Sequence, residues 1–274
     1  MSQPAPPEGP APEARRPDPQ RTDVLELPAE VWRIVVLGDP HGDLIALEQV
    51  LRQESRPDTL VLSAGDNVGY SDGAVSSYLC QVLEERKIRS VRGNHEAWSE
   101  DGTLFHSPPG LPRQLSEVAQ RWINALPTRI RIRAAARPEL SISLTHCLPN
   151  WAYVNAKEAR RFLDLEEADL VLCGHTHRPA VYSVGPRARK ATSKRFDPRS
   201  KTPLRVELKP KTRVVCDAGS LARPSRPRRG AQPGGMCLEY GTYAVVDLRA
   251  GAVELHSVDK RARLQEVFEQ LAGG

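Results

Sequence analysis

The sequence lacks the features of a secreted, disulfide-bonded or membrane-spanning protein. Its five cysteines are odd in number and no two are spaced as Cys-x-x-Cys, so we expect reduced thiols rather than a disulfide framework. No stretch approaches the roughly 18 apolar residues that a membrane helix needs, and the first residues lack the apolar core of a signal peptide. We therefore expect a cytoplasmic protein that does not contact a membrane.

Hydrophobic residues make up 39% of the 274 residues, enough for one large domain or two small ones. The formal charge of +5 makes anionic partners plausible, although a coding bias toward Arg and Pro is an equally good explanation. Residues 1–25 contain seven prolines and almost no large apolar side chain. We expect a disordered tail there, passive rather than partner-binding, followed by one domain over 26–274.

Apolar runs and amphipathic patterns alternate along the first half of the domain. This order predicts right-handed βαβ units and a largely parallel sheet, whereas the second half is richer in strands. We expect two facing sheets with helices outside. The expected strands are 32–37, 59–62, 88–91, 129–133, 140–144, 169–173, 180–184, 204–208, 213–216, 242–247 and 252–257, and the expected helices are 43–53, 75–83, 115–123 and 263–271.

Five short polar motifs follow or close these apolar runs. Because ligands in α/β sheets collect beyond the carboxyl ends of strands, the motifs are expected to converge on one site. Five of the seven histidines lie in the motifs, which makes a purely structural role for the whole set hard to sustain. The motifs are Asp39-Pro40-His41, Gly65-Asp66-Asn67, Gly93-Asn94-His95-Glu96, Thr145-His146 and Gly174-His175-Thr176-His177.

The side chains in these motifs suit two adjacent divalent metal ions. Carboxylate, imidazole and amide oxygen favour first-row ions, with Mn²⁺ as the first choice and Fe²⁺, Zn²⁺, Ni²⁺ or Co²⁺ as alternatives. Asp66 is the natural bridge, because one carboxylate can serve two cations. Asp39 and Asp66 cancel only part of the metal charge, and the remainder could hold a hydroxide and an anionic phosphate.

The motifs resemble those of the calcineurin-like metallophosphoesterase superfamily over about residues 33–248. Its pattern is D-x-H, G-D, G-N-H-D/E, H and G-H-x-H, and the small bacterial and archaeal phosphodiesterase branch is the most similar. Gly65-Asp66-Asn67-Val68-Gly69-Tyr70 and Asp217-Ala218-Gly219-Ser220 match further elements of that branch. The resemblance implies a four-layer α/β/β/α sandwich of two mixed sheets, with a dinuclear metal site at the strand ends.

The resemblance also implies roles for individual residues. One metal would be held by Asp39, His41 and His177, the other by Asn94, His146 and His175, with Asp66 as bridge. His95 would be a catalytic non-ligand that contacts phosphate or protonates the leaving oxygen, unless it only orients its neighbours.

Two departures from related families narrow the function. Serine/threonine protein phosphatases continue the second motif as G-D-x-V-D-R-G, whereas this chain has Gly69 and Tyr70 at the Asp and Arg positions. The partner that would orient His95 and the Arg that would bind phosphate are therefore missing. This disfavours a protein phosphatase and a symmetrical diadenosine-tetraphosphate hydrolase.

Residues 185–213 form a basic insertion with eleven Lys and Arg against Asp197 and Glu207. It begins soon after His177 and could attract a nucleotide or nucleic acid, although it lacks interleaved aromatic residues and could equally be a solvated hairpin. Arg178 and Arg223 are candidates for a phosphate contact.

Our first hypothesis is a phosphodiesterase for nucleotides or related molecules, in which a metal-bridged hydroxide attacks phosphorus. A phosphomonoesterase of broad range, a nuclease and a non-enzymatic metal-binding scaffold are the alternatives. The substrate and the oligomeric state cannot be derived from the sequence.

Overall fold

Two sheets face each other because alternate side chains of their strands are buried in the same interface. The computed structural model describes residues 21–223 and 237–272. Ile34 and Val36 of one sheet pack with Leu144, Leu172 and Val214 of the other in a central apolar layer. In a strand, residues two apart share a face, so the intervening residues point outward and meet helices.

The first sheet carries the three parallel strands predicted from the first half of the chain. β2, β3 and β4 run parallel, and β12 joins them to the rest of the sheet in antiparallel pairing. Its order is β10 (Leu204–Glu207), β13 (Ala252–Asp259), β12 (Tyr240–Asp247), β2 (Arg33–Leu37), β3 (Thr59–Ser63) and β4 (Arg89–Ser90).

The second sheet is also mixed. Within it, β6, β7 and β11 are parallel neighbours, so their carboxyl ends lie at one edge. Its order is β1 (Thr22–Leu27), β5 (Arg129–Ala134), β6 (Ile142–Thr145), β7 (Leu170–Cys173), β11 (Arg213–Asp217), β8 (Ala180–Val184) and β9 (Thr192–Arg195).

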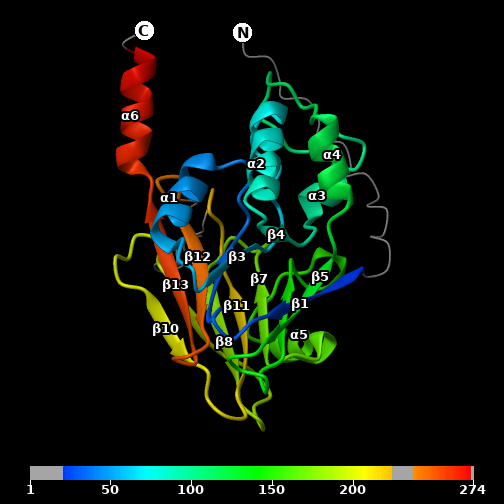
Figure 1. Ribbon diagram of the computed structural model, residues 1–274, viewed down its shortest axis with the longest axis vertical. Coiled ribbons are helices and arrows are strands. Elements are labelled where there is room, and N and C mark those ends of the chain that lie inside the picture. Colours follow the sequence, from blue (N-terminus) through cyan, green and yellow to red (C-terminus); the bar gives the residue numbers. More distant parts are fainter. Residues whose placement is uncertain (1–20, 224–236, 273–274) are drawn as a thin grey trace.

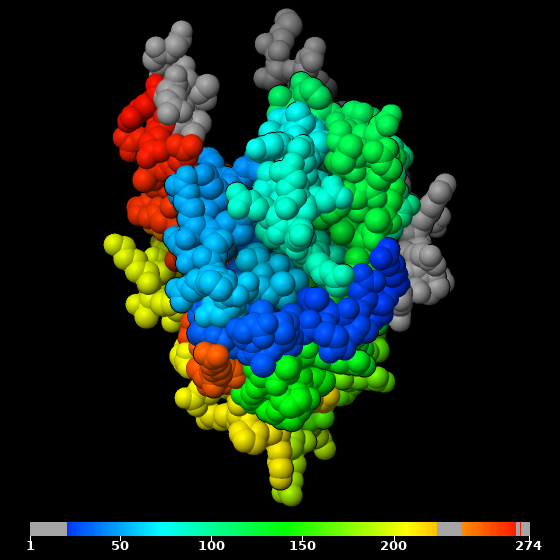
Figure 2. Space-filling view, in the orientation of Figure 1, coloured from blue at the N-terminus to red at the C-terminus, as the bar shows by residue number. Residues whose placement is uncertain are grey.

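Helices cover the outer face of each sheet, which completes the predicted four layers (Figure 1). On the first sheet, Val35 and Val245 pack with α1 and α2; on the second, Val171 and Val215 pack with Phe162 of α5. α6 extends away from the body (Figure 2). The helices are α1 (Leu44–Glu54), α2 (Gly73–Glu85), α3 (Asn94–Trp98), α4 (Glu117–Asn124), the 3₁₀ turn η1 (Pro149–Trp151), α5 (Ala159–Glu166) and α6 (Arg261–Ala272).

β1 starts inside the segment predicted to be a disordered tail. Residues 22–27 pair in parallel with β5 from Thr22 onward, and Leu27 reaches the central core. The strand was not predicted because its own residues are largely exposed and its partner lies a hundred residues later. The tail expected over residues 1–25 therefore overlaps β1 from Thr22 onward, while residues 1–20 lie outside the described part of the chain.

The basic insertion contains two edge strands, β9 and β10, of which β10 was expected at 204–208. β9 extends the second sheet beside β8, whereas β10 extends the first sheet beside β13. Because Ala180 pairs with Asp217 and Val184 with Arg213, β8 leads the chain away from the strand ends that carry the polar motifs. The expectation that the insertion starts at the rim of the metal site is therefore wrong. Arg199, Arg205 and Arg213 form ion pairs with Asp197, Glu254 and Asp164.

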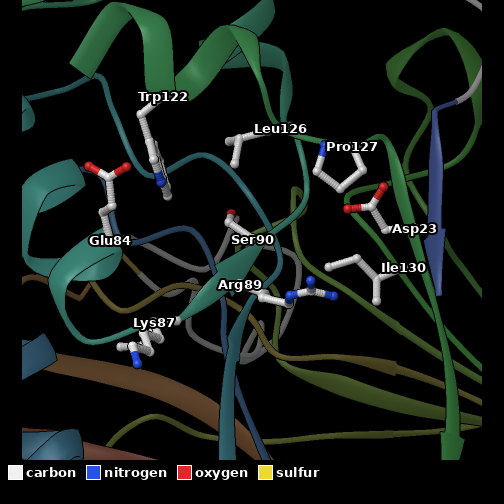
Figure 3. Close-up of a pocket in the computed structure, with 10 residues that line it drawn as sticks. Asp23, Glu84, Lys87, Arg89, Ser90, Trp122, Leu126, Pro127 and Ile130 are labelled. Atoms are coloured by element: carbon white, nitrogen blue, oxygen red, sulfur yellow. The ribbon is translucent and has the colours of Figure 1, made fainter. Parts of the chain in front are cut away.

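A cavity of about 270 Å³ lies between the edge strands β4 and β1. Trp122 and Leu126 line it from the side of α4, and Arg89 lies across from them (Figure 3). Ser90 lines this cavity, and its hydroxyl accepts a hydrogen bond from Asn67 Nδ2 of the second motif.

Two further predictions can be checked against this fold. None of the five cysteines forms a disulfide, as the sequence predicted. Among the helices of the described residues, none has both the length and the apolar character needed to cross a bilayer.

Candidate metal centre

The five motifs converge at one edge of the sandwich, where the ends of strands from both sheets meet. Asp39, Asp66 and Asn94 follow strands of the first sheet, while His146 and His175 follow β6 and β7 of the second. The carboxylate and imidazole atoms of Asp39, His41 and His177 lie within 4.8 Å of one another, as do those of Asp39, Asp66 and His146. The predicted convergence is therefore present, and these side chains are buried except that of His175, which is half-buried.

Three of the histidines are fixed in one tautomer by backbone carbonyls. His41 Nδ1 donates to the Val68 carbonyl at 2.9 Å, His146 Nδ1 to the Ala64 carbonyl at 2.7 Å, and His175 Nε2 to the Trp151 carbonyl at 2.9 Å. In a neutral imidazole, one nitrogen is a donor and the other carries a lone pair. The second nitrogen of each ring is therefore an acceptor that points into the cluster.

These lone pairs face other acceptors. His146 Nε2 lies 3.0 Å from Asn94 Oδ1 and 3.3 Å from Asp66 Oδ2, and His175 Nδ1 lies 2.8 Å from the same amide oxygen. His41 Nε2 lies 3.1 Å from His177 Nε2, and no backbone carbonyl among the described residues fixes the tautomer of His177. Acceptors at such distances repel unless a proton or a cation lies between them. The donor set of imidazole, carboxylate and amide oxygen therefore fits divalent cations.

The electrostatics of the cluster also favour a cation. Burial lowers the pKa of His146, but the charge and hydrogen bond of Asp66 outweigh burial and raise it to about 10. With this pKa the His146 ring would keep its second proton near neutral pH. That proton supplies, beside the carboxylates, the positive charge that a bound cation would supply. Within the described residues, the buried His177 Nδ1 has no hydrogen-bond partner. This leaves His177 held mainly through Nε2, which lies 3.1 Å from Asp39 Oδ2.

The backbone at Gly174 and His175 passes close to the Asp39 carboxylate. A Cβ added at Gly174 would lie 2.2 Å from Asp39 Oδ1, so only glycine lets the chain pass there. Next to it, the His175 backbone N–H donates to both oxygens of Asp39, at 2.9 and 2.8 Å. This contact joins a loop of the second sheet to a residue of the first.

Glu96 organises the loops of the first sheet from behind. Its fully buried carboxylate accepts the backbone N–H groups of Asp66, Asn67 and Gly93 at 3.0, 2.6 and 2.8 Å. Asp66 Oδ1 in turn accepts the backbone N–H of His95 at 2.9 Å. Asp66 and the Asn94–His95 pair are therefore held in one network.

His95 sits inside a ring of aromatic side chains. Its ring centre lies 4.6 Å from that of His41, 4.8 Å from Tyr70, 5.2 Å from Trp98 and 5.3 Å from His106. At the position where protein phosphatases have an Asp that orients this histidine, the chain has Gly69, which has no side chain. Burial, which outweighs the opposing charge of Asp66, lowers the pKa of His95 to about 4.

The two candidate arginines differ in placement. The Arg223 guanidinium lies over the Tyr70 ring, 4.6 Å from its centre, and the same ring contacts His41 and His95. Arg178 is exposed, and its backbone N–H donates to Thr176 Oγ1 at 3.0 Å. The structure thus brings Arg223 next to the metal-binding residues through Tyr70.

The sequence prediction missed the segment that follows β6. Cys147 lies beside His146 and His175, although burial raises the pKa of its thiol. Trp151 supplies the carbonyl that fixes His175, and the ring of Tyr153 stacks on His175 with centres 4.8 Å apart and planes 25° apart. The only sequence signal was proximity to the Thr145-His146 motif.

The comparisons with known proteins agree with this geometry. The family model of the calcineurin-like phosphoesterases matches residues 33–179, more than half of the chain. No curated protein matches. A metallophosphoesterase from Sphaerobacter thermophilus has the same fold, with a TM-score of 0.62, 23% identity, and coverage of 88% of this chain and 94% of the other.

Two further solved structures match at lower similarity. One is a putative diadenosine tetraphosphatase, with a TM-score of 0.45, 17% identity, and coverage of 86% of this chain and 97% of the other. The second is a serine/threonine phosphatase from Saccharomyces cerevisiae, with a TM-score of 0.43, 15% identity, and coverage of 87% and 83%. The match of the family model, together with the converging ligand loops, shows that this chain belongs to the calcineurin-like phosphoesterase family and is a metal-dependent hydrolase of phosphate esters.

Proposed function

We propose that this chain holds two divalent ions and hydrolyses phosphodiesters, with nucleotides and related small molecules as substrates. The observation that supports this most is the pair of lone pairs on His146 and His175 aimed at the Asn94 amide oxygen, beside two carboxylates from different strand ends. The five thiols without a disulfide also support a cytosolic location for this activity.

We assign the donors to two groups that share the Asp66 carboxylate. When bound, two divalent ions supply Lewis acidity, which offsets the charge of a phosphate and acidifies a nearby water. We favour Mn²⁺, because the donors are oxygens and imidazoles. Asp39, His41 and His177 would hold one ion, Asn94, His146 and His175 the other, and Asp66 both.

His95 is our catalytic residue. Its lowered pKa keeps the ring neutral near pH 7, so it carries one N–H that can donate to a phosphate oxygen or to the leaving oxygen. The rings of Tyr70, Trp98 and His106 restrict its orientation, which takes over the role that an Asp has in the protein phosphatases.

Arg223 is our first candidate for holding the phosphate. Its guanidinium is positioned over Tyr70, and its buried Nε has no hydrogen-bond partner within the described residues. A planar guanidinium can donate two parallel hydrogen bonds to a phosphate. Arg178, exposed beside the Gly174–His177 motif, is the second candidate.

Metal content and a pair of chromogenic esters test the proposal. Protein loaded with Mn²⁺ should retain two ions per chain after gel filtration and should hydrolyse bis-p-nitrophenyl phosphate faster than p-nitrophenyl phosphate. A preference for the monoester would replace the phosphodiesterase by a phosphomonoesterase. Two bound ions with no turnover of either ester would favour the scaffold.

The role of His95 is tested by His95→Ala, with His256→Ala as the matched control. His256 lies on β13, where its Nε2 is 3.0 Å from Glu254 Oε2. We expect His95→Ala to keep both ions and to lose about 10²–10³-fold in kcat, the usual cost of removing one hydrogen-bond donor to the charge that develops in the transition state. His256→Ala should change neither quantity. Loss of an ion in His95→Ala would show that His95 is a ligand.

A further inference from the structure

Two tyrosines remain exposed beside a cluster whose other side chains are largely buried. Tyr70 follows β3 of the first sheet and is 38% exposed, and Tyr153 follows β6 of the second sheet and is 62% exposed. Tyr70 contacts His41 and His95, whereas Tyr153 contacts His175. The two aromatic side chains therefore flank the metal-binding residues on two different sides.

The faces of Tyr70 are already occupied. The Arg223 guanidinium lies 4.6 Å from its ring centre, and His95 and His106 lie 4.8 and 5.5 Å from it. This side contains the residues to which we assign the phosphate contact and the leaving oxygen. A leaving group that departs beside His95 would therefore leave past Tyr70.

Tyr153 has an open face. Its ring lies nearly parallel to the imidazole of His175, which covers one face, while most of the side chain remains exposed. The backbone before it is fixed in an uncommon conformation, with φ of 59° at Asn150 and 58° at Trp151. Bulky residues adopt such angles only where the surrounding structure holds them. Here the hydrogen bond from His175 to the Trp151 carbonyl does so.

A fixed aromatic ring with one open face beside a phosphate site is suited to stacking against a planar ligand. We propose that Tyr153 is a specificity residue that stacks on the nucleobase or aryl ring of the diester substituent that stays attached to phosphorus. This inference rests on the proposed function. It narrows the substrate class to diesters with an aromatic substituent opposite the leaving group.

Three diesters with one leaving group isolate this role. They are p-nitrophenyl methyl phosphate, bis-p-nitrophenyl phosphate and thymidine 5′-p-nitrophenyl phosphate, so only the retained substituent changes from methyl to aryl to nucleoside. For each substrate, kcat and KM of the variant are divided by those of the wild type, so that the intrinsic reactivity of the substrate cancels. Tyr153→Ala removes the ring, Tyr153→Leu keeps apolar bulk without an aromatic face, and Tyr153→Phe keeps the aromatic face.

We expect Tyr153→Ala and Tyr153→Leu to raise KM about tenfold for a diester with a retained ring, with little change in kcat, the size expected for loss of one stacked ring. The methyl diester should be unaffected, and Tyr153→Phe should behave like wild type. Tyr78→Ala is the matched control, because Tyr78 is a 55% exposed tyrosine on the outer helix α2. An increase in KM limited to the thymidine ester would mean that Tyr153 stacks on a nucleobase. An increase for both ring-bearing esters would mean that it stacks on any planar ring.

An equal loss on all three diesters would overturn the inference, because it would mean that Tyr153 only positions His175. Unchanged KM values in Tyr153→Ala and Tyr153→Leu would overturn it as well. Failure of the wild-type protein to cleave any diester would instead reject the proposed phosphodiesterase, and the inference with it. Bound metal measured in each variant separates loss of the centre from loss of stacking.

Discussion

Single residues at the metal centre hold backbone conformations that are rare elsewhere in proteins. Six of them have left-handed φ angles between 37° and 72°, and these are Asp39, His41, Asp66, Tyr70, His175 and His177. Such angles cost free energy in residues with a Cβ and persist where the surroundings fix them. Each lies in a loop just beyond a strand end, so the strain accompanies the sharp turn that aims the side chain at the cluster.

Gly69 is the residue whose substitution should separate catalysis from metal binding. A Cβ there would lie 2.1 Å from His95 Nδ1, and φ is +91°. We expect Gly69→Ala to displace the His95 ring and reduce kcat by at least tenfold while both metal ions remain bound. Gly110→Ala is the matched control, because Gly110 also has a positive φ of +82° but nothing within 4 Å of the added Cβ. Equal kcat values in the two variants would contradict this prediction.

At this scale the sequence predicted the converging residues but not their surroundings. Asp39, Asp66, His146 and His175 could be recognised because their residue types and strand-end positions carry the information. Two contacts could not be predicted, because they depend on where two loops fold back. These are the His106 ring stacked on Tyr70 and the Trp151 carbonyl bonded to His175. Short motifs report local chain direction, whereas contacts between loops depend on tertiary packing.

Among the elements, α5 is held against the second sheet by an ion pair of low exposure as well as by apolar packing. Glu166 ends the helix, and its carboxylate accepts two hydrogen bonds from Arg129 of β5 at 2.6 and 2.7 Å. The Ser143 hydroxyl of β6 donates to the same carboxylate at 2.6 Å. The hydrogen bond with Glu166 raises the pKa of Arg129, so the guanidinium remains charged.

Removing one partner of this pair should destabilise the fold. The Glu166 side chain is 4% exposed and that of Arg129 is 16% exposed, so Glu166→Ala would leave a guanidinium with little access to water. We expect a loss of about 3 kcal/mol in the free energy of unfolding, measured by urea denaturation. Glu48→Ala is the control, because it breaks an exposed pair with Arg52 and should cost less than about 1 kcal/mol. Similar losses in the two variants would show that burial of the pair does not matter.

The two strands that the sequence did not predict lie at the edges of the second sheet. β1 and β9 are edge strands with mostly exposed side chains, so no apolar run marks them. The strand expected at 88–91 contains only Arg89 and Ser90 in its ladder, because it is the last strand of its sheet. Central strands such as β8 could be placed at 180–184 because they are buried on both faces.

For the whole molecule, the metal centre lies where the two sheets come together. Asp39 extends from the first sheet and accepts the His175 N–H of the second, while His146 of the second sheet lies 3.3 Å from Asp66 of the first. Ligands from both sheets can come together only after the chain has folded. Metal binding should therefore stabilise the folded protein much more than the unfolded chain.

We expect the melting temperature to depend on metal, through ligands contributed by both sheets. At a free Mn²⁺ concentration of 100 times Kd, one site adds about 2.7 kcal/mol to the stability of the folded state. In a chain of this size, that corresponds to an increase of about 5–10 °C. The measurement is thermal unfolding after removal of metal with a chelator, with and without added Mn²⁺. Asp66→Asn should show little of this increase, because a neutral amide cannot bridge two cations. Without metal it should be less stable than the wild type near pH 7, because it removes the carboxylate that pairs with His146 and raises the pKa of that ring. An equal increase in Asp66→Asn and wild type would mean that the stabilising ion binds elsewhere, and the assignment of Asp66 as the bridge would be wrong.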